Sequence, residues 1–299
     1  MSSNKLSVII PVYNDPEGIR DTIESLVDQD YKGSYEILPV DNNSTDSTGE
    51  VIQKFEEEYP EKVRGLEENK IQSSYATRNK GIKESEGEIL CFIDADMRAP
   101  EDYLSKLEKK YRDNEKKCIG CNVSVTSNKN NVVTRYRLSK GFNIGKLIQH
   151  LNYIPTCALT IRKETVEDIG LFDQRMVSGG DVVYSKKIIQ KGYDLYFAED
   201  IVLEHPARET IRELVKKQKR VGKGLHQMRK YHKNLSKERS PLDIRNFLPP
   251  KPFGFSKTFR DWDDKKISEK LIYYNINYLL KLVRNTAHLK KSITSTLPS

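Results

Sequence analysis

Two aspartates one residue apart, Asp94 and Asp96, follow an apolar run in the segment CFIDADMRAP, residues 91–100. The run at residues 89–93 is typical of a strand that is covered on both faces of a sheet. An extended turn after such a strand can direct both carboxylates toward one hard divalent ion, and oxygen ligands suit Mg²⁺ or Mn²⁺ better than Zn²⁺. A D-x-D pair alone is more often structural, because acids also cap helices and bind backbone amides in turns.

Two further apolar segments end in acidic residues. LSVIIPVYND, residues 6–15, predicts a buried strand that ends before Asp15, and YEILPVDNNS, residues 35–44, predicts a second strand that stops at Asp41. The carboxyl ends of parallel strands share one edge of a sheet, where ligands bind. Acids gathered at one edge repel one another unless a cation or hydrogen-bond donors neutralise them. The pattern therefore predicts a site at this edge that holds a cation or a set of hydrogen-bond donors.

Strands and helices alternate along residues 5–206, which predicts an α/β fold with a doubly wound, mostly parallel sheet flanked by helices. Residues 126–152 are polar and rich in loop formers, so no order of elements is predicted there. IPTCALTIR predicts a strand at 154–162, residues 181–191 predict a helix, and YDLYFAED and IVLEHP predict two edge strands at 193–200 and 201–206. Basic helices, interrupted by LPPKPFGF at 248–255, are predicted beyond residue 206.

The two parts of the chain differ in charge. Residues 1–206 hold 28 Lys and Arg against 35 Asp and Glu, and residues 207–299 hold 23 against 8, so the parts carry −7 and +15. A basic tail favours an anionic partner such as phospholipid, a phosphorylated carrier or nucleic acid. The apolar cluster at 271–283 is too short to span a bilayer and is expected to pack on the body, on a second subunit or on a membrane surface.

The four cysteines are too few for a disulfide framework in a chain of 299 residues. They favour a reducing compartment, so we expect a cytoplasmic location, with peripheral attachment to the cytoplasmic face of a membrane as an option for the basic tail. Cys118 and Cys121 form a CxxC pair, but no second pair or nearby histidine completes a zinc set.

Six segments together resemble the family-2 glycosyltransferases of the GT-A fold. They are SVIIPVYND, ILPVDNNSTDST, ATRNKGI, GEILCFIDADMRAPEDYL, SGGDVVYSKKIIQKGYDLYFAED and EHPAR, in that order. The resemblance implies a GT-A domain at residues 1–224. Residues 225–299 are then a basic helical extension that contacts the acceptor, a membrane or a second subunit.

The resemblance also implies roles for individual residues. It places around the nucleotide Pro11, Tyr13, Asp15, Asp41, Arg78, Asn79 and Asp94. It makes Asp96 a metal ligand, joined by His205, whose alternative role is a histidine packed at a strand end. It makes Asp181 the catalytic base, a role compatible with a helix N-cap, and places Gly179, Gly180 and Arg220 beside the acceptor.

The implied reaction transfers a sugar from a nucleotide-diphosphate donor, with a UDP-sugar favoured, to a hydroxyl of a glycan, lipid-linked or other acceptor. It proceeds with inversion by a single displacement that uses Mn²⁺ or Mg²⁺. A sugar-phosphate nucleotidyltransferase is an alternative, but PVYNDPEG after the first strand is no glycine-rich phosphate loop. A nucleic-acid-binding protein is another, but it leaves the acids unexplained and lacks a recognisable binding module. We therefore expect no nucleic-acid partner, and homodimerisation stays open.

Overall fold

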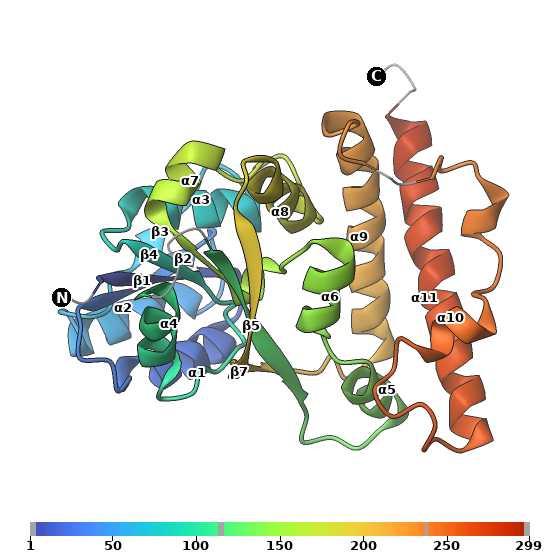
Figure 1. Cartoon of the computed structure of the whole chain (residues 1–299), viewed down its shortest axis with the longest axis horizontal. Helices are drawn as coiled ribbons and strands as arrows, with labels where there is room; N and C mark the ends of the chain where they lie inside the picture. The colour runs from blue at the N-terminus through green and yellow to red at the C-terminus, as the bar shows by residue number, and fades with distance from the viewer. Residues whose placement is uncertain (1–3, 113–116, 237–238, 296–299) are drawn as a thin grey trace. The chain divides into compact units, whose positions relative to one another are not determined.

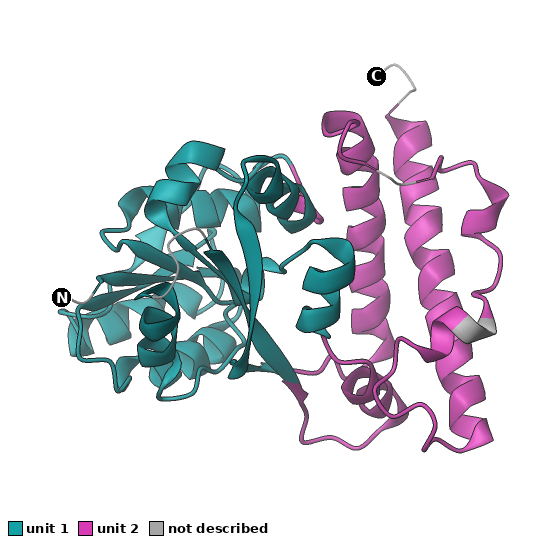
Figure 2. Cartoon of the chain, in the orientation of Figure 1, with its two compact units in different colours: residues 1–124, 143–175, 181–205 teal, residues 125–142, 176–180, 206–299 magenta. Residues whose placement is uncertain are grey.

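The protein is described by a computed structural model that covers residues 4–112, 117–236 and 239–295. The chain divides into two compact units (Figure 2). Unit 1 comprises residues 1–124, 143–175 and 181–205, and unit 2 comprises residues 125–142, 176–180 and 206–299.

The strands are β1 (Leu6–Val12), β2 (Tyr35–Asp41), β3 (Leu66–Glu67), β4 (Ile89–Phe92), β5 (Lys117–Thr126), β6 (Leu159–Arg162) and β7 (Asp194–Pro206). The helices that accompany them through β7 are α1 (Pro16–Val27), α2 (Thr48–Glu58), α3 (Ser74–Glu84), α4 (Tyr103–Arg112), α5 (Val132–Lys140), α6 (Ile144–Leu151), the 3₁₀ turn η1 (Thr156–Ala158), α7 (Lys163–Ile169) and α8 (Gly180–Gln190). The helices after β7 are α9 (Ile211–Tyr231), η2 (Ile244–Asn246), α10 (Pro252–Ser256) and α11 (Ile267–Thr294).

The strands form one seven-stranded sheet in the order β3-β2-β1-β4-β6-β5-β7. β1 pairs in parallel with β2 and β4, and β2 pairs in parallel with β3, whereas β6 runs antiparallel to both β4 and β5. Helices cover both faces of the parallel part, with α3 and α7 on one side and α1 and α2 on the other (Figure 1). The predicted α/β fold with a mostly parallel sheet is confirmed.

Burial of the central strands explains their composition. Residues of β1 and β4 that face either side, such as Val8, Ile9 and Phe92, are fully buried, because helices lie on both faces. All four cysteines are free and buried as well. Burial raises the pKa of both the Cys91 and the Cys118 thiol to about 12, so these thiols stay protonated and behave as small apolar side chains.

Three predictions of local structure were incomplete. The strand expected at 154–162 is shorter, because Thr156–Ala158 form the turn η1 and β6 begins at Leu159. The two strands expected at 193–200 and 201–206 are one strand, β7, at the edge of the sheet. Its buried positions change phase between Ala198 and Ile201, and the prediction divided the strand at that change. The segment at 126–152, for which no order of elements was predicted, contains α5 and α6. Asn131 and Thr134 form a capping box at the start of α5, and this pair of residues is a helix-start signal that the prediction did not use.

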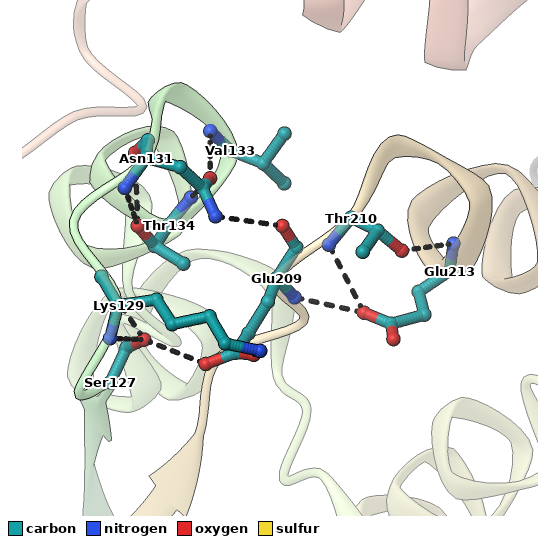
Figure 3. Close-up of polar contacts among 8 residues, drawn as sticks. All are labelled: Ser127, Lys129, Asn131, Val133, Thr134, Glu209, Thr210 and Glu213. Carbon is teal, nitrogen blue, oxygen red and sulfur yellow. Dashed lines mark hydrogen bonds and ion pairs between the residues drawn. The ribbon is translucent and has the colours of Figure 1, made fainter.

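Unit 2 begins where the chain leaves β5 and β7, and polar contacts join these two exits (Figure 3). Asn131 caps α5 and also donates from its side chain to the Glu209 carbonyl, 3.2 Å away. Lys129 forms an ion pair with Glu209, while Thr210 and Glu213 form a capping box at the start of α9. The two caps and the ion pair fix α5 and α9 relative to each other.

The apolar core of unit 2 is aromatic. Tyr136 of α5 and Leu214 of α9 pack with Phe255, Phe259 and three residues of α11, namely Tyr273, Ile276 and Leu280. One face of the 271–283 cluster is therefore buried within unit 2, whereas Leu271 and Leu279 on its other face are exposed. None of the helices in the described ranges combines the length and the hydropathy that a membrane-spanning segment requires. The domain boundary predicted at residue 224 lies inside α9 and stays a prediction; residues 237–238 and 296–299 of the predicted extension lie outside the described residues.

Helices α9 and α11 lie side by side (Figure 1), and Gly222 of α9 permits their close approach. A Cβ at Gly222 would lie 2.2 Å from the Arg284 carbonyl oxygen and 2.8 Å from the Ala287 Cβ. Gly222→Ala is therefore expected to lower the free energy of unfolding by about 1–3 kcal/mol, because neither backbone nor methyl group can move aside cheaply.

Chemical denaturation of Gly222→Ala tests this expectation, with Gly49→Ala in α2 as the control. A Cβ at Gly49 meets nothing closer than 3.9 Å, so alanine there is expected to be neutral or stabilising by up to about 1 kcal/mol. Equal stability of the Gly222 variant and the unmodified protein would contradict the packing described for these helices.

Candidate active site

The acids singled out in the sequence lie at one edge of the sheet. Because β2, β1 and β4 are parallel neighbours, Asp41 at the end of β2, Asp15 after β1, and Asp94 and Asp96 after β4 share the carboxyl edge. The turns after β1 and β4 approach each other closely at Gly18, in the first turn of α1. A Cβ at Gly18 would lie 2.4 Å from the Asp15 Oδ2 and 2.5 Å from the Ala95 carbonyl oxygen. The turn after β1 therefore lies directly beside the turn that holds both aspartates.

Hydrogen bonds fix the two acids nearest the first helices. Asp15 caps α1, and its Oδ1 accepts from the Gly18 amide at 3.0 Å. Burial raises the pKa of Asp15, and this amide hydrogen bond opposes the rise. Asp41 accepts from both the amide and the hydroxyl of Ser44. Both carboxylates are thus oriented by the helix-leading turns that follow their strands.

Arg78 and Asp94 form an ion pair at the same edge. The Arg78 guanidinium donates to the Asp94 Oδ1 at 2.6 Å, and a second nitrogen donates to the Ser74 carbonyl at 3.2 Å. The Arg78 side chain is 5% exposed and that of Asp94 is 38% exposed. Arg78 therefore supplies a nearly buried positive charge beside a carboxylate that solvent still reaches.

Asn79, the neighbour of Arg78 in α3, is used inside the fold. Its amide nitrogen donates to the Phe172 carbonyl at 2.9 Å, and its oxygen accepts from the Phe172 amide at 3.0 Å. The Asn79 side-chain amide therefore forms two hydrogen bonds with the Phe172 backbone, in the way that a residue of a neighbouring strand would. Its predicted place beside the nucleotide stays a prediction.

His205 lies next to Asp96 although the two residues are far apart in the sequence. The His205 Nε2 is 3.7 Å from the Asp96 Oδ1, with the imidazole buried and the carboxylate 36% exposed. An antiparallel bridge between Arg98 and Glu204 holds them together, with amide-to-carbonyl distances of 3.0 and 2.9 Å. A carboxylate and an imidazole are both ligand types that Mn²⁺ accepts. Among the described residues, no group of three or more His, Cys, Asp and Glu side chains could hold a metal ion.

Asp181, near the start of α8, is held by a tyrosine that the sequence did not reveal. The Tyr153 hydroxyl donates to the Asp181 Oδ2 at 2.8 Å, and the Val182 amide approaches Oδ1 at 3.0 Å. Tyr153 is positioned in turn because the next amide, that of Ile154, donates to the Ser185 hydroxyl one turn further along α8. Burial raises the pKa of Asp181, and the Tyr153 hydrogen bond opposes the rise. Asp181 is thus a carboxylate with increased basicity and a fixed orientation.

The remaining predicted residues lie in several places. Pro11 is within β1 and partly buried, and Tyr13 follows the strand with half of its side chain exposed. Gly179 adopts φ +83°, which strains other residues, and is part of a segment of unit 2, residues 176–180, that packs on α9. The Gln227 side chain accepts from the Val177 amide at 2.9 Å, and a Cβ at Gly224 would lie 2.3 Å from the Ser178 carbonyl. Gly180 begins α8, and Arg220 is exposed on α9.

A family model and a curated relative both match this chain as a glycosyltransferase. A family model described as Glycosyl transferase family 2 matches residues 7–170. Glycosyltransferase AglE of Haloferax volcanii is 39% identical over 221 residues, which cover 73% of this chain and 72% of that protein.

Two solved structures share the fold. Mannosyltransferase PcManGT from Pyrobaculum calidifontis in complex with GDP-Man and Mn²⁺ has a TM-score of 0.63 and 15% identity, covering 99% of this chain and 89% of that one. TarS residues 1–349 from S. aureus in complex with UDP-GlcNAc has a TM-score of 0.57 and 16% identity, covering 99% of this chain and 93% of that one.

Proposed function

This chain belongs to glycosyltransferase family 2, and we propose from that membership that it transfers a sugar from a nucleotide-diphosphate donor to an acceptor hydroxyl with inversion of the anomeric centre. The general activity is the transfer of a sugar from a nucleotide-sugar donor by an enzyme of the GT-A fold. A UDP-sugar as donor, a glycan or lipid-linked molecule as acceptor, and a divalent cation are the specific parts of the proposal. The observation that carries it is the edge where Asp15, Asp41, Asp94 and Asp96 follow adjacent parallel strands.

The donor's nucleotide is proposed to lie along the carboxyl ends of β1 and β2. Pro11 and Tyr13 would flank the base, and Asp15 and Asp41 would accept hydrogen bonds from the base or the ribose. The half-exposed ring of Tyr13 supports this placement, because a base can stack on an accessible aromatic face.

The diphosphate is proposed to lie near Asp94 and Asp96. Arg78 would offset its negative charge, and Asn79 would lie beside it while its amide binds the Phe172 backbone. Asp96 and His205 fit a Mn²⁺ or Mg²⁺ ion, because such ions are commonly held by few protein ligands together with phosphate oxygens. When bound, the ion stabilises negative charge on the departing diphosphate.

Asp181 is proposed to be the catalytic base. As the acceptor oxygen forms its bond to the anomeric carbon, the bond from that carbon to the diphosphate oxygen breaks, and the hydroxyl proton passes to the Asp181 carboxylate. The raised pKa of Asp181 supports this role, since a more basic carboxylate takes a proton more readily. Gly179, Gly180 and Arg220 remain proposed acceptor residues.

A donor screen tests the proposed function. UDP-, GDP- and dTDP-sugars are incubated with the protein and Mn²⁺ or Mg²⁺, and binding and nucleoside diphosphate release are measured. We expect a UDP-sugar to bind and to be hydrolysed slowly, and EDTA to abolish the release. Failure of every donor, together with tight and salt-sensitive binding of RNA, would instead favour a nucleic-acid-binding protein.

Location and assembly are proposed from the charge of residues 207–299 and from the exposed apolar side chains of α11. The basic residues 207–299 and the exposed Leu271 and Leu279 of α11 favour contact with an anionic membrane surface from the cytoplasm. Flotation with anionic vesicles tests this contact, and absence of flotation would favour homodimerisation or acceptor binding as the use of the extension.

Removing the Tyr153 hydroxyl is expected to change the pH dependence of sugar transfer. Its hydrogen bond lowers the pKa of Asp181, so Tyr153→Phe raises that pKa further. Because only the ionised carboxylate accepts a proton, the acid limb of the pH profile of kcat should move to higher pH. Tyr59→Phe removes a hydroxyl at the end of α2 and should leave the profile unchanged. A Tyr153→Phe profile that coincides with that of the unmodified protein would contradict the contact's role.

A further inference from the structure

A cavity within unit 2 is lined by positive side chains from three helices. Its volume is about 190 Å³, and its cationic lining comprises Arg137 and Lys140 of α5, Lys217 of α9, and Lys281 and Arg284 of α11. Among the described residues, those that line the cavity include no Asp or Glu. Five cations therefore converge on one small space, and all five are partly buried.

The pKa values show that these charges are held at a cost. Burial, together with the nearby charges of Arg137 and Arg284, lowers the pKa of Lys140 to about 8. Burial also lowers the pKa of Arg137 and of Lys281. A buried cation is destabilising unless an anion or hydrogen bonds compensate it. An anion in the cavity would reverse this cost for several side chains at once.

The cavity is also built to hold its cations in place. The Lys140 ammonium donates to the Asn277 Oδ1 at 3.1 Å and lies over the ring of Tyr136, which is fixed in the aromatic core of unit 2. The Lys281 ammonium donates to the Leu248 carbonyl at 2.7 Å. The buried Arg137 Nε has no hydrogen-bond partner among the described residues, so this donor is left for a ligand. Fixed donors lose little entropy when a ligand binds.

We propose that this cavity is a binding site for a phosphate-bearing ligand, a phosphate monoester or a diphosphate group. A phosphate carries up to two charges and several acceptor oxygens, and arginine binds it with paired donors. The cavity is smaller than the roughly 300–1,000 Å³ of pockets that enclose drug-sized molecules, so it suits a small anion or the phosphorylated end of a longer one. The site goes beyond the proposed sugar transfer and does not depend on it, because its residues all lie in unit 2 and outside the acidic edge.

Calorimetric titration of the full chain with inorganic pyrophosphate tests the site. EDTA is present so that a metal-dependent diphosphate site does not contribute, and salt of about 0.15 M screens diffuse attraction beyond about 8 Å. The test variant is Arg137→Gln with Lys140→Gln. The matched control is Lys216→Gln with Lys219→Gln, which removes two exposed lysines of α9 that do not line the cavity.

We expect the test variant to bind pyrophosphate at least tenfold more weakly and the control to stay within about twofold, because hydrogen bonds to charged groups are among the stronger ones. A second arm measures binding to phosphatidylcholine vesicles that contain phosphatidic acid. Loss of pyrophosphate binding in the test variant identifies a site for soluble phosphates, and loss of vesicle binding alone identifies a site for a lipid phosphate; both support the proposal.

The proposal is overturned if neither probe binds, or if the test variant and the control bind both probes equally. Circular dichroism establishes that the variants fold. If the double variant does not fold, Lys217→Glu probes the same cavity from a different helix. It should weaken pyrophosphate binding at least tenfold, and unchanged affinity would equally overturn the site.

Discussion

Replacing Asp181 with Asn is expected to lower kcat by about 10²–10⁴-fold while leaving donor binding unchanged. General-base catalysis contributes a factor of this size, and Asn cannot accept the proton. The substitution keeps the size of the side chain and an acceptor oxygen for the Tyr153 hydroxyl, so the start of α8 should keep its conformation. Steady-state kinetics with the best donor of the screen, and calorimetric titration of the same donor, provide the two readouts.

Asp168→Asn is the matched control, because Asp168 is an exposed carboxylate of α7 that pairs with Lys191 on the surface. It should leave both kcat and donor binding unchanged, since exposed ion pairs contribute little. An equal fall in turnover and donor affinity for Asp181→Asn would show that the residue serves binding or folding, and would remove it from the role of base.

Replacing Asp96 with Asn should lower metal-dependent donor affinity on the order of 10²-fold. Loss of a residue that merely supports a metal ligand already costs about 10–100-fold in affinity, so loss of the ligand itself should cost at least as much. The measurement is titration of UDP, or of the donor identified in the screen, in the presence of Mn²⁺ and again in EDTA. The difference between the variant and the unmodified protein should vanish in EDTA.

Asp102→Asn tests whether loss of any acid from unit 1 has the same effect. Asp102 directly precedes α4, is partly exposed, and forms an ion pair with Lys106 of that helix. Its variant should titrate like the unmodified protein with either metal. Retention of full Mn²⁺ dependence in Asp96→Asn would rule out Asp96 as the metal ligand.

The sequence sufficed for the acidic edge because strand ends carry a local signal. The apolar runs before Asp15, Asp41 and Asp94 mark three buried strands, and alternation with helices requires these strands to be parallel. Their shared edge then follows from topology without any distance. The structure bears out the three strands, their burial and the common edge.

Contacts between distant segments carried no such signal. Tyr153 follows directly after the segment 126–152, for which no order of elements was predicted, and nothing in the residue types indicates that it meets Asp181. Asn79 occupies a motif position expected beside the nucleotide, yet its amide binds the Phe172 backbone. The cationic cavity combines α5, α9 and α11, whereas the sequence predicted only basic helices beyond residue 206 and no contact among them.

The bridge between Arg98 and Glu204 has a consequence for biosynthesis. The nascent chain acquires the aspartates of the carboxyl edge early, but His205 joins Asp96 only after the last strand has been translated and has docked at the sheet. Long-range pairings of this kind form late, because closing a long loop of chain costs conformational entropy before the stabilising contacts are made. Ribosome-bound chains that end before β7 would thus possess the aspartates without their imidazole partner.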